Sequence, residues 1–195
     1  MRQTKIALGL LVMLATLGVA AEARAGSPTE FLKKIDAKMD PLLANAQANE
    51  AKIIKQINKM LDFDTLCKDS LGKHWEGRTD AEREEFVTTL KALIEKNVTH
   101  RLADTRDHIV TYESEQVSGT EATVTTLVAS GTGPRATQTE IVYKMEKRGP
   151  RWVVVDMITD GVSLVQNYRS QFNKIITKDG WATLIQKMKD KLAEA

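Results

Sequence analysis

The spacing of apolar residues changes about half-way along this chain of 195 residues, and the change limits the folds open to it. Before residue 107, apolar residues recur every three or four positions, as in helices that bury one face. From Asp107 they alternate with polar residues, and valine, isoleucine and threonine become frequent, which indicates strands. After residue 162 the helical spacing returns. Helices, then strands, then helices predict an α+β fold and not a βαβ fold.

Capping sequences mark where the expected helices begin. Residues 27–30, Ser-Pro-Thr-Glu, form a capping box with proline at the first helical position. The helix that follows should bend or restart at Pro41 and continue in the same period to a break near Asp62.

The remaining helices have similar start and stop signals. A short helix is expected over residues 65–71, with Gly72 in the left-handed position after it. A long helix should begin after the capping residue Thr79, and another after Ser163. Asp179 is expected to open the last helix.

Four alternating segments predict a sheet. Turn-type residues separate them, including Gly131–Pro134, which we interpret as a tight loop. Such short connections join antiparallel neighbours, so a meander is expected. The predicted strands are Ile109–Val117, Ala122–Val128, Thr139–Met145 and Trp152–Ile158.

The fourth predicted strand is apolar on both faces. Strict alternation places Trp152 and Val154 on one face, and Val153, Val155 and Met157 on the other. An antiparallel sheet that packs on one side normally keeps a polar face. The strand is therefore either central in an ordinary core or lines a cavity.

The N-terminus has the form of a cleavable export signal. Basic residues precede an apolar run over residues 6–21, and small residues lead to an expected cleavage after Ala25. The run is shorter than the roughly 20 residues that span a bilayer. No cysteine follows the cleavage site for lipid attachment, since Cys67 is the only cysteine. We expect a signal peptide over residues 1–25 and a single exported, unanchored domain over residues 26–195.

The charge of the expected mature chain argues against nucleic acid as a partner. Residues 1–25 hold three basic and one acidic residue, so the 28 basic and 26 acidic residues of the whole chain fall to 25 of each. Binding to a phosphate backbone needs a basic excess. A lone cysteine also excludes an internal disulfide, and Cys67 is expected to be a small buried residue.

Few residues point to catalysis. His74, His100 and His108 lack the spacing of metal ligands, and Ser163 lacks the second glycine of a nucleophile elbow. Asp156 stands among valines, either as a hydrogen-bonded structural residue or as a general base with a raised pKa. We therefore expect that the protein is not an enzyme and that it binds neither a metal ion nor a cofactor.

Several segments together resemble a known family. The most specific is the strand-to-helix join, in which Trp152–Ile158 is followed by Gly161–Leu164 and by Tyr168, Arg169, Gln171 and Phe172. Leu71-Gly72 before Trp75 and Glu82-Arg83 before Phe86 fit as well. These segments are similar to those of the MlaC or toluene-tolerance auxiliary family, and the similarity runs from about Phe31 to Leu192.

The resemblance implies a fold and a function. The fold would be a cystatin-like curved antiparallel four-stranded sheet, wrapped by helices around an apolar cavity. The function would be that of a monomeric periplasmic carrier of phospholipid, held as cargo. It would work between an inner-membrane ABC transporter with an MCE-domain subunit and an outer-membrane lipoprotein complex, and so maintain lipid asymmetry. The chain departs from the family by being short between Pro41 and Asp62.

Two alternatives stay open. A related branch of the family suggests a hopanoid or another polycyclic lipid as cargo. The lysines of the last two helices suggest instead a transporter adaptor that binds no lipid, although a solvated helix face also explains them. These lysines are Lys174, Lys178, Lys187, Lys189 and Lys191.

A lipid carrier needs a site that excludes water. Exposing an acyl chain of about 16 carbons to water costs about 13 kcal/mol, at about 0.8 kcal/mol per methylene. Apolar side chains on one strand face and on the facing helices would line such a site. The residues predicted to line it are Leu90, Ile94, Val110, Tyr112, Ile141, Tyr143, Val153, Val155, Met157 and Phe172.

Overall fold

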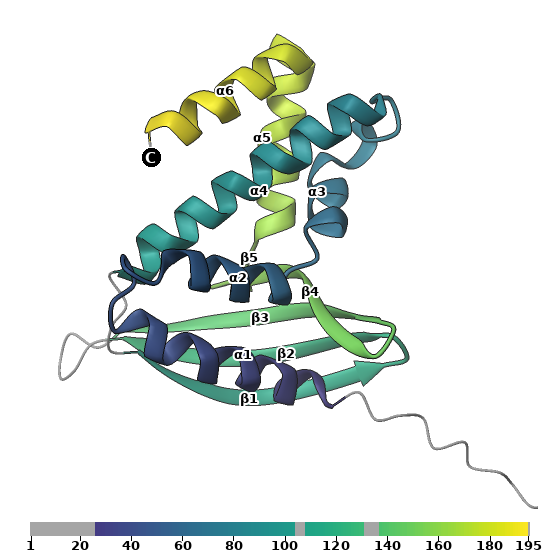
Figure 1. Ribbon diagram of the computed structural model, residues 1–195. Helices are drawn as coiled ribbons and strands as arrows, with labels where there is room; N and C mark the ends of the chain where they lie inside the picture. The colour runs from purple at the N-terminus through teal and green to yellow at the C-terminus, as the bar shows by residue number, and fades with distance from the viewer. Residues whose placement is uncertain (1–25, 104–107, 131–136, 195) are drawn as a thin grey trace, which may run out of the picture.

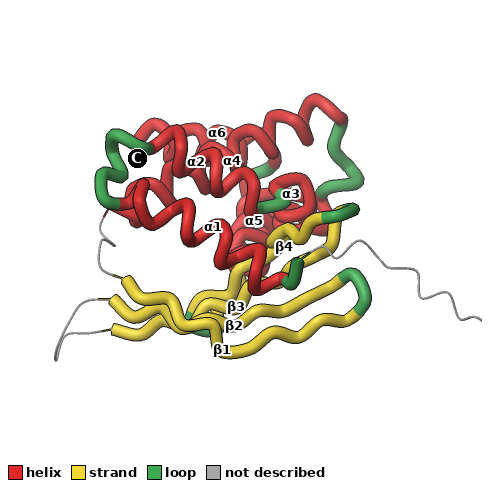
Figure 2. The backbone as a smooth tube through the Cα atoms, turned by 60° about the horizontal axis from the view of Figure 1, so that its bottom comes forward, coloured by secondary structure: helices red, strands yellow, loops and turns green. Residues whose placement is uncertain are grey.

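The computed structural model describes residues 26–103, 108–130 and 137–194. In this part of the chain an open antiparallel sheet of five strands carries six α-helices, which lie on one side of it (Figures 1 and 2). The predicted α+β class and the antiparallel meander are therefore confirmed. The expected signal peptide and the Gly131–Pro134 loop lie outside the described residues.

The elements follow one another along the chain with short connections. The helices are α1 (Pro28–Leu43), α2 (Glu50–Met60), α3 (Phe63–Leu71), α4 (Asp80–Ala103), α5 (Leu164–Asp179) and α6 (Trp181–Glu194). The strands are β1 (His108–Ser118), β2 (Glu121–Ser130), β3 (Thr137–Arg148), β4 (Arg151–Thr159) and β5 (Val162–Ser163). A 3-10 turn, η1 (Gly72–His74), joins α3 to the loop before α4.

The predicted caps begin the helices as expected. The side-chain oxygens of Ser27, Thr79 and Ser163 each accept the backbone N–H of the third residue after them, at 3.0–3.3 Å. The expectation for Asp179 is wrong, because this residue is the last of α5. Gly180, with a φ of +85°, ends α5, and its N–H donates to a carbonyl in the last turn.

The sheet differs from the prediction in strand number and in one strand's alternation. It has five strands and not four, because Val162 and Ser163 add a short edge strand beside β4. Within β4, Val154 pairs with Met145 but Asp156 pairs with Lys144, which leaves Val155 as the extra residue of a β-bulge.

After the bulge, the side chains of β4 face the opposite sides of the sheet from those that strict alternation predicts. Cross-strand partners share a face, so Met157 lies on the same side as Trp152 and Val154, while Val153 lies on the opposite side. The prediction that Val153, Val155 and Met157 share one face is therefore wrong. Alternation by twos fails wherever one strand contains an additional residue.

A second bulge lies in β1, between Tyr112 and Ser114. It turns both Tyr112 and Glu115 toward the helices, although these residues are three positions apart. Bulges bend the strand that carries them, so two bulges in four long strands curve the sheet. The concave side is the one that faces the helices (Figure 2).

The main core lies between this side of the sheet and the helices. Val124, Met145 and Val154 are almost fully buried on the sheet, which α1, α2, α3 and α5 contact. Phe86 and Leu90 of α4, both 0% exposed, extend the same core between the helices. Burying each large apolar side chain stabilises the fold by about 1.5–3 kcal/mol.

Candidate functional site

Helix α1 lies along β1, on the helix-facing side of the sheet, and runs in the opposite direction. Near its start, the Thr29 N–H donates to the Glu115 carboxylate at 2.7 Å. In its middle, the Tyr112 hydroxyl donates to the Asp36 carboxylate. α1 therefore covers the edge strand through polar contacts as well as through its apolar stripe.

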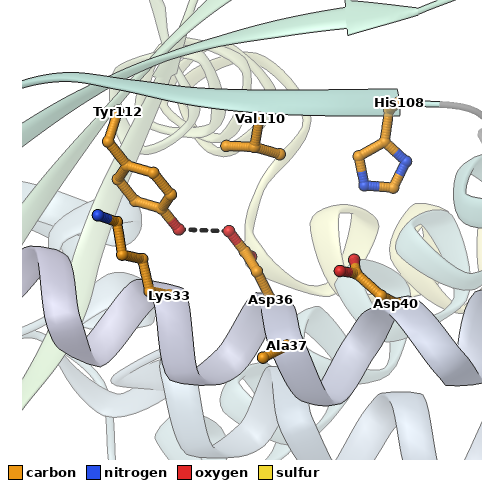
Figure 3. Close-up of a pocket in the computed structure, with 7 residues that line it drawn as sticks. All are labelled: Lys33, Asp36, Ala37, Asp40, His108, Val110 and Tyr112. Atoms are coloured by element: carbon orange, nitrogen blue, oxygen red, sulfur yellow. Dashed lines mark hydrogen bonds between the residues drawn. The ribbon is translucent and has the colours of Figure 1, made fainter.

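Between α1 and β1 lies a pocket of about 230 Å³. Figure 3 shows its side chains pointing toward one another from the helix and from the strand. We call it the α1–β1 pocket; its lining residues are Lys33, Asp36, Ala37, Asp40, His108, Val110 and Tyr112. It combines charges of both signs with an aromatic ring and a valine.

The charged groups of the pocket are unequally solvated. Burial raises the pKa of the Asp36 carboxyl and the nearby Asp40 charge adds to this, while the Tyr112 hydrogen bond opposes it. Burial and the neighbouring Asp36 likewise raise the pKa of the Tyr112 hydroxyl. The Lys33 ammonium lies 5.1 Å from the centre of the Tyr112 ring, within the range of a cation–π contact. The pocket therefore holds a carboxylate that is poorly stabilised as an anion.

The helix-facing side of the sheet continues inward from this pocket. Tyr112 is in register with Thr126, and Thr126 with Ile141, so the three share this face. Tyr143 and Met157 lie in the next row on the same face. Burial raises the pKa of Tyr143 to about 12, which keeps its hydroxyl neutral at physiological pH. This inner surface is apolar apart from uncharged hydroxyl groups.

The structure thus brings together part of the predicted lipid-lining set. Val110 and Tyr112 lie in the α1–β1 pocket, and Ile141, Tyr143 and Met157 lie on the same side of the sheet. Each of these five side chains is partly exposed and not buried in a closed core.

The other five predicted residues lie elsewhere. Leu90, Ile94 and Phe172 are buried in the core between helices, where the Phe172 ring packs edge-on against Phe86 with centroids 5.5 Å apart. Val153 faces the other side of the sheet, and Val155 is the bulged residue. Whether any of the ten contacts lipid stays a prediction.

Sequence reasoning missed the acidic and basic residues of α1. Lys33, Asp36, Ala37 and Asp40 recur at helical spacing and so share one face of α1. This polar face adjoins the apolar stripe that begins with Leu32. The spacing was visible in the sequence, but only the position of β1 shows that the face borders a pocket.

The other candidate residues have structural explanations. Asp156 accepts hydrogen bonds from the Ser163 hydroxyl at 2.6 Å and from the backbone N–H groups of Met157 and Val165 at 2.8 and 3.0 Å. It thus ties β4 to the start of α5. Cys67 is fully buried, and burial raises the pKa of its thiol to about 12.

His74 and two of the C-terminal lysines also have local partners. His74 lies 3.0 Å from the Asn173 side-chain oxygen, and Lys187 and Lys189 form ion pairs at 3.2 and 2.6 Å. Within the described residues, no group of three histidine, cysteine or acidic side chains is arranged to bind a metal ion. The side chain of His100 lies outside the described part.

Comparison with known proteins decides the family. The family model described as MlaC protein matches residues 27–190. The chain belongs to the MlaC family. This MlaC-family chain is 25% identical over 172 residues to the intermembrane phospholipid transport system binding protein MlaC of Haemophilus influenzae, covering 80% of this chain and 78% of that protein. It is also 25% identical over 199 residues to the toluene tolerance protein Ttg2D of Pseudomonas putida, covering 93% and 91%.

A solved structure confirms the fold of this MlaC-family chain. The phospholipid-binding protein of Ralstonia solanacearum, determined in complex with a phospholipid, superposes with a TM-score of 0.73. The match covers 87% of this chain and 98% of that one, at 20% sequence identity. No helix among the described residues has the length and apolar character needed to cross a membrane.

Proposed function

We propose that this chain is a periplasmic phospholipid carrier that takes lipid between an inner-membrane ABC transporter with an MCE-domain subunit and an outer-membrane lipoprotein complex. Membership in the MlaC family carries the proposal. One relative is named for intermembrane phospholipid transport, and the protein of similar fold was solved with a phospholipid. Lipid is cargo in this proposal, and no residue is assigned a catalytic role.

The geometry supports a site between α1 and the concave face of the sheet. There the partly exposed apolar side chains are continuous with a pocket that opens at the surface. We infer that acyl chains lie against Val110, Tyr112, Ile141, Tyr143 and Met157. Leu90, Ile94 and Phe172 lie in the core between helices, and Val153 and Val155 lie off this row of side chains, so the proposed site does not include them.

The site must widen to accept lipid. Pockets for drug-sized ligands have volumes of about 300–1,000 Å³, and a two-chain phospholipid is larger than such ligands. The α1–β1 pocket, at about 230 Å³, is too small for it. Lipid entry therefore requires α1 and the sheet to separate.

The test is the lipid content of the purified protein. Full-length protein would be exported in a Gram-negative host, purified from the periplasm, extracted with organic solvent and examined by mass spectrometry. We expect phospholipid at about one molecule per chain, and an N-terminus at Gly26. A polycyclic lipid in the extract would support hopanoid cargo. If repeated preparations contain no lipid but the protein still binds its transporter, the result would favour the adaptor function.

A matched pair of variants locates the site. Ile141 faces the helices and Val142 faces away, and both are partly buried in neighbouring positions of β3. Ile141→Trp should fill the space beside the pocket and lower the bound lipid several-fold. Val142→Trp should leave the lipid content unchanged. Equal losses in both variants would contradict this location, and melting temperatures would show whether either is unfolded.

A further inference from the structure

The large apolar side chains that are most exposed among the described residues lie on the two edge strands of the sheet. The strand order β1-β2-β3-β4-β5 leaves β1 and β5 each with one edge that no described strand pairs with (Figure 1). Ile109 and Val117 on β1 are 70% and 52% exposed, and Val162 on β5 is 59% exposed. An edge strand presents backbone N–H and C=O groups with which another extended chain can pair. Of the two, only β1 is long enough for such pairing, with 11 residues against two in β5.

The two halves of β1 differ in how this edge is protected. Proteins usually protect an edge strand with charged side chains and β-bulges. The second half of β1 has both, because the bulge between Tyr112 and Ser114 is accompanied by Glu113 and Glu115. Residues 109–112 have neither, since they are Ile, Val, Thr and Tyr in regular pairing with β2. The first half of β1 is therefore the unprotected part of this edge.

Helix α1 covers one face of this segment and leaves its edge open. The helix contacts both β1 and β2, so it lies over the sheet and not beyond β1 (Figure 2). Val110 and Tyr112 line the pocket beneath α1, whereas Ile109 is exposed on the opposite face. No backbone group of another described element bonds to residues 109–112 on the side away from β2. A second chain that approaches there meets open hydrogen-bonding groups and an apolar side chain.

We propose that residues 109–112 bind an extended segment of a partner protein, which adds a strand to the sheet and places an apolar side chain against Ile109. The free edge specifies an extended chain, because such a chain pairs with successive N–H and C=O groups of a strand. Glu113 disfavours an acidic residue opposite it. Val110 and Tyr112 also line the α1–β1 pocket, so the partner would lie next to the proposed lipid site. The role of this partner in lipid transfer rests on the proposed function, whereas the docking site does not.

A second copy of this chain fits the edge less well than a different protein does. Stable interfaces use about 20–30 residues on each side, whereas residues 109–112 are a short stretch. Antiparallel pairing along the whole of β1 would be interrupted by the bulge and would bring Glu113 of the two copies together. A short added strand suits the transient contact of a carrier with its partners.

Hydrogen exchange in the presence of a synthetic peptide tests the proposal. The probe is a short capped peptide of alternating threonine and valine with a lysine at each end, added at millimolar concentration to the purified protein. NMR spectroscopy follows the exchange of each amide. A peptide at its Kd slows the exchange of a paired amide about twofold, so we expect a slowing of about two- to fivefold within residues 109–112. The same peptide with two adjacent residues N-methylated cannot pair along either of its edges and should have no effect.

Three matched variants locate the docking site, since each replaces an exposed apolar residue of an edge strand by aspartate. Ile109→Asp should abolish the slowing, whereas Val117→Asp, beyond the bulge, and Val162→Asp, on β5, should retain it. No slowing in the unaltered protein, equal slowing in the Ile109→Asp variant, or loss of the slowing in all three variants would overturn the proposal.

Two further measurements separate this proposal from its alternatives. Analytical ultracentrifugation of the unaltered protein should show a monomer, and a dimer that Ile109→Asp dissociates would overturn the assignment to a partner protein in favour of a second copy. The lipid content of the same samples tests the carrier function independently. It should be unchanged by Ile109→Asp, because this side chain lies on the face opposite the pocket. An empty Ile109→Asp variant beside a lipid-filled unaltered protein would contradict that placement.

Discussion

At the scale of single residues, two partly buried aspartates, Asp156 and Asp36, differ in the number of hydrogen-bond donors that they contact. Asp156 accepts from one hydroxyl and two backbone N–H groups, which satisfies a carboxylate without any cation. Asp36 is placed beside Asp40 and receives the Tyr112 hydroxyl. The first arrangement satisfies the carboxylate with three donors, whereas burial and the nearby Asp40 raise the pKa of Asp36 in the second.

Replacing Asp156 by asparagine should weaken the fold and spare the function. The amide retains one acceptor oxygen and turns an NH₂ group toward a donor, so we expect a loss of about 1–3 kcal/mol in the free energy of unfolding. Chemical denaturation measures this loss. Lipid content at 25 °C should be unchanged, and a variant of normal stability that binds no lipid would contradict the structural role.

The control for this variant is Asp160→Asn. Asp160 lies in an exposed turn with a φ of +47°, a conformation that asparagine adopts readily. Its side chain accepts only from the exposed Glu140 N–H, at 3.1 Å, among the hydrogen bonds of the described residues. We expect its unfolding free energy to stay within about 0.5 kcal/mol of the unaltered protein.

Asp36→Asn should stabilise the protein in a pH-dependent way. The folded-state pKa of Asp36 is raised, so its contribution to stability is complete below the ordinary value of 3.8 and is lost as the pH rises through the folded pKa. The variant avoids this loss because asparagine never ionises. We expect its melting temperature to exceed that of the unaltered protein by about 1–3 °C at pH 7.

Parallel thermal melts from pH 3 to pH 8 check the sign of this difference. The gain of the Asp36→Asn variant should vanish near pH 3, where both side chains are neutral. A gain that is largest at pH 3, or a variant that is less stable at pH 7, would show that the Asp36 charge stabilises the fold.

At the scale of elements, α1 has two faces with different environments. Its apolar stripe is buried, including Leu32 and Ile35, while its polar face borders the α1–β1 pocket. Two hydrogen bonds connect it to β1: the Thr29 N–H donates to Glu115, and the Tyr112 hydroxyl donates to Asp36. A helix held by few polar contacts at a sheet edge separates more readily than one enclosed in the core.

Joining α1 to β1 should block lipid uptake. Cysteines at positions 29 and 115, linked by a short thiol-reactive crosslinker, would hold the start of α1 against the strand. We expect delipidated, crosslinked protein to take up several-fold less phospholipid than the same protein before crosslinking, because the layer can no longer widen. The native Cys67 is fully buried and should not react.

The same pair of cysteines capped separately with a monofunctional reagent is the control. It carries the same substitutions without the link, so it should take up lipid normally. Uptake at the normal rate by the crosslinked protein would show that the chains enter without movement at this end of α1.

At the scale of the whole molecule, the helices all cover one side of an open sheet (Figure 2). The α1–β1 pocket, at about 230 Å³, is smaller than a two-chain phospholipid needs. If the chain carries phospholipid as proposed, the space between α1 and the sheet must be wider in the loaded state.

Bound phospholipid should therefore stabilise the molecule. A ligand that binds only the folded state adds about 2.7 kcal/mol at a concentration one hundred times its Kd, or a rise of about 5–11 °C in melting temperature for a chain of this size. Scanning calorimetry of delipidated and reloaded protein measures the rise. Identical melting temperatures, with lipid shown to be present, would contradict binding between the layers.

Much of the fold could be predicted because its signals are local. The caps at Ser27, Thr79 and Ser163 and the alternation in four strands depend on neighbours within a few residues. The change of spacing near residue 107 then determines the α+β class. The segments that resemble the MlaC family also lie in the sequence itself, and the family match confirms them.

The features of the fold and of the site that could not be predicted depend on tertiary contacts. The bulges at Val155 and after Tyr112 decide which side chains face the helices, and a bulge depends on how two strands pair. The α1–β1 pocket exists only because the polar face of α1 lies along β1. The sequence by itself therefore determined the class of fold and the family, since periodicity and caps act locally. Only the tertiary structure decided which residues meet at the site, because that depends on the register and packing of segments far apart in the chain.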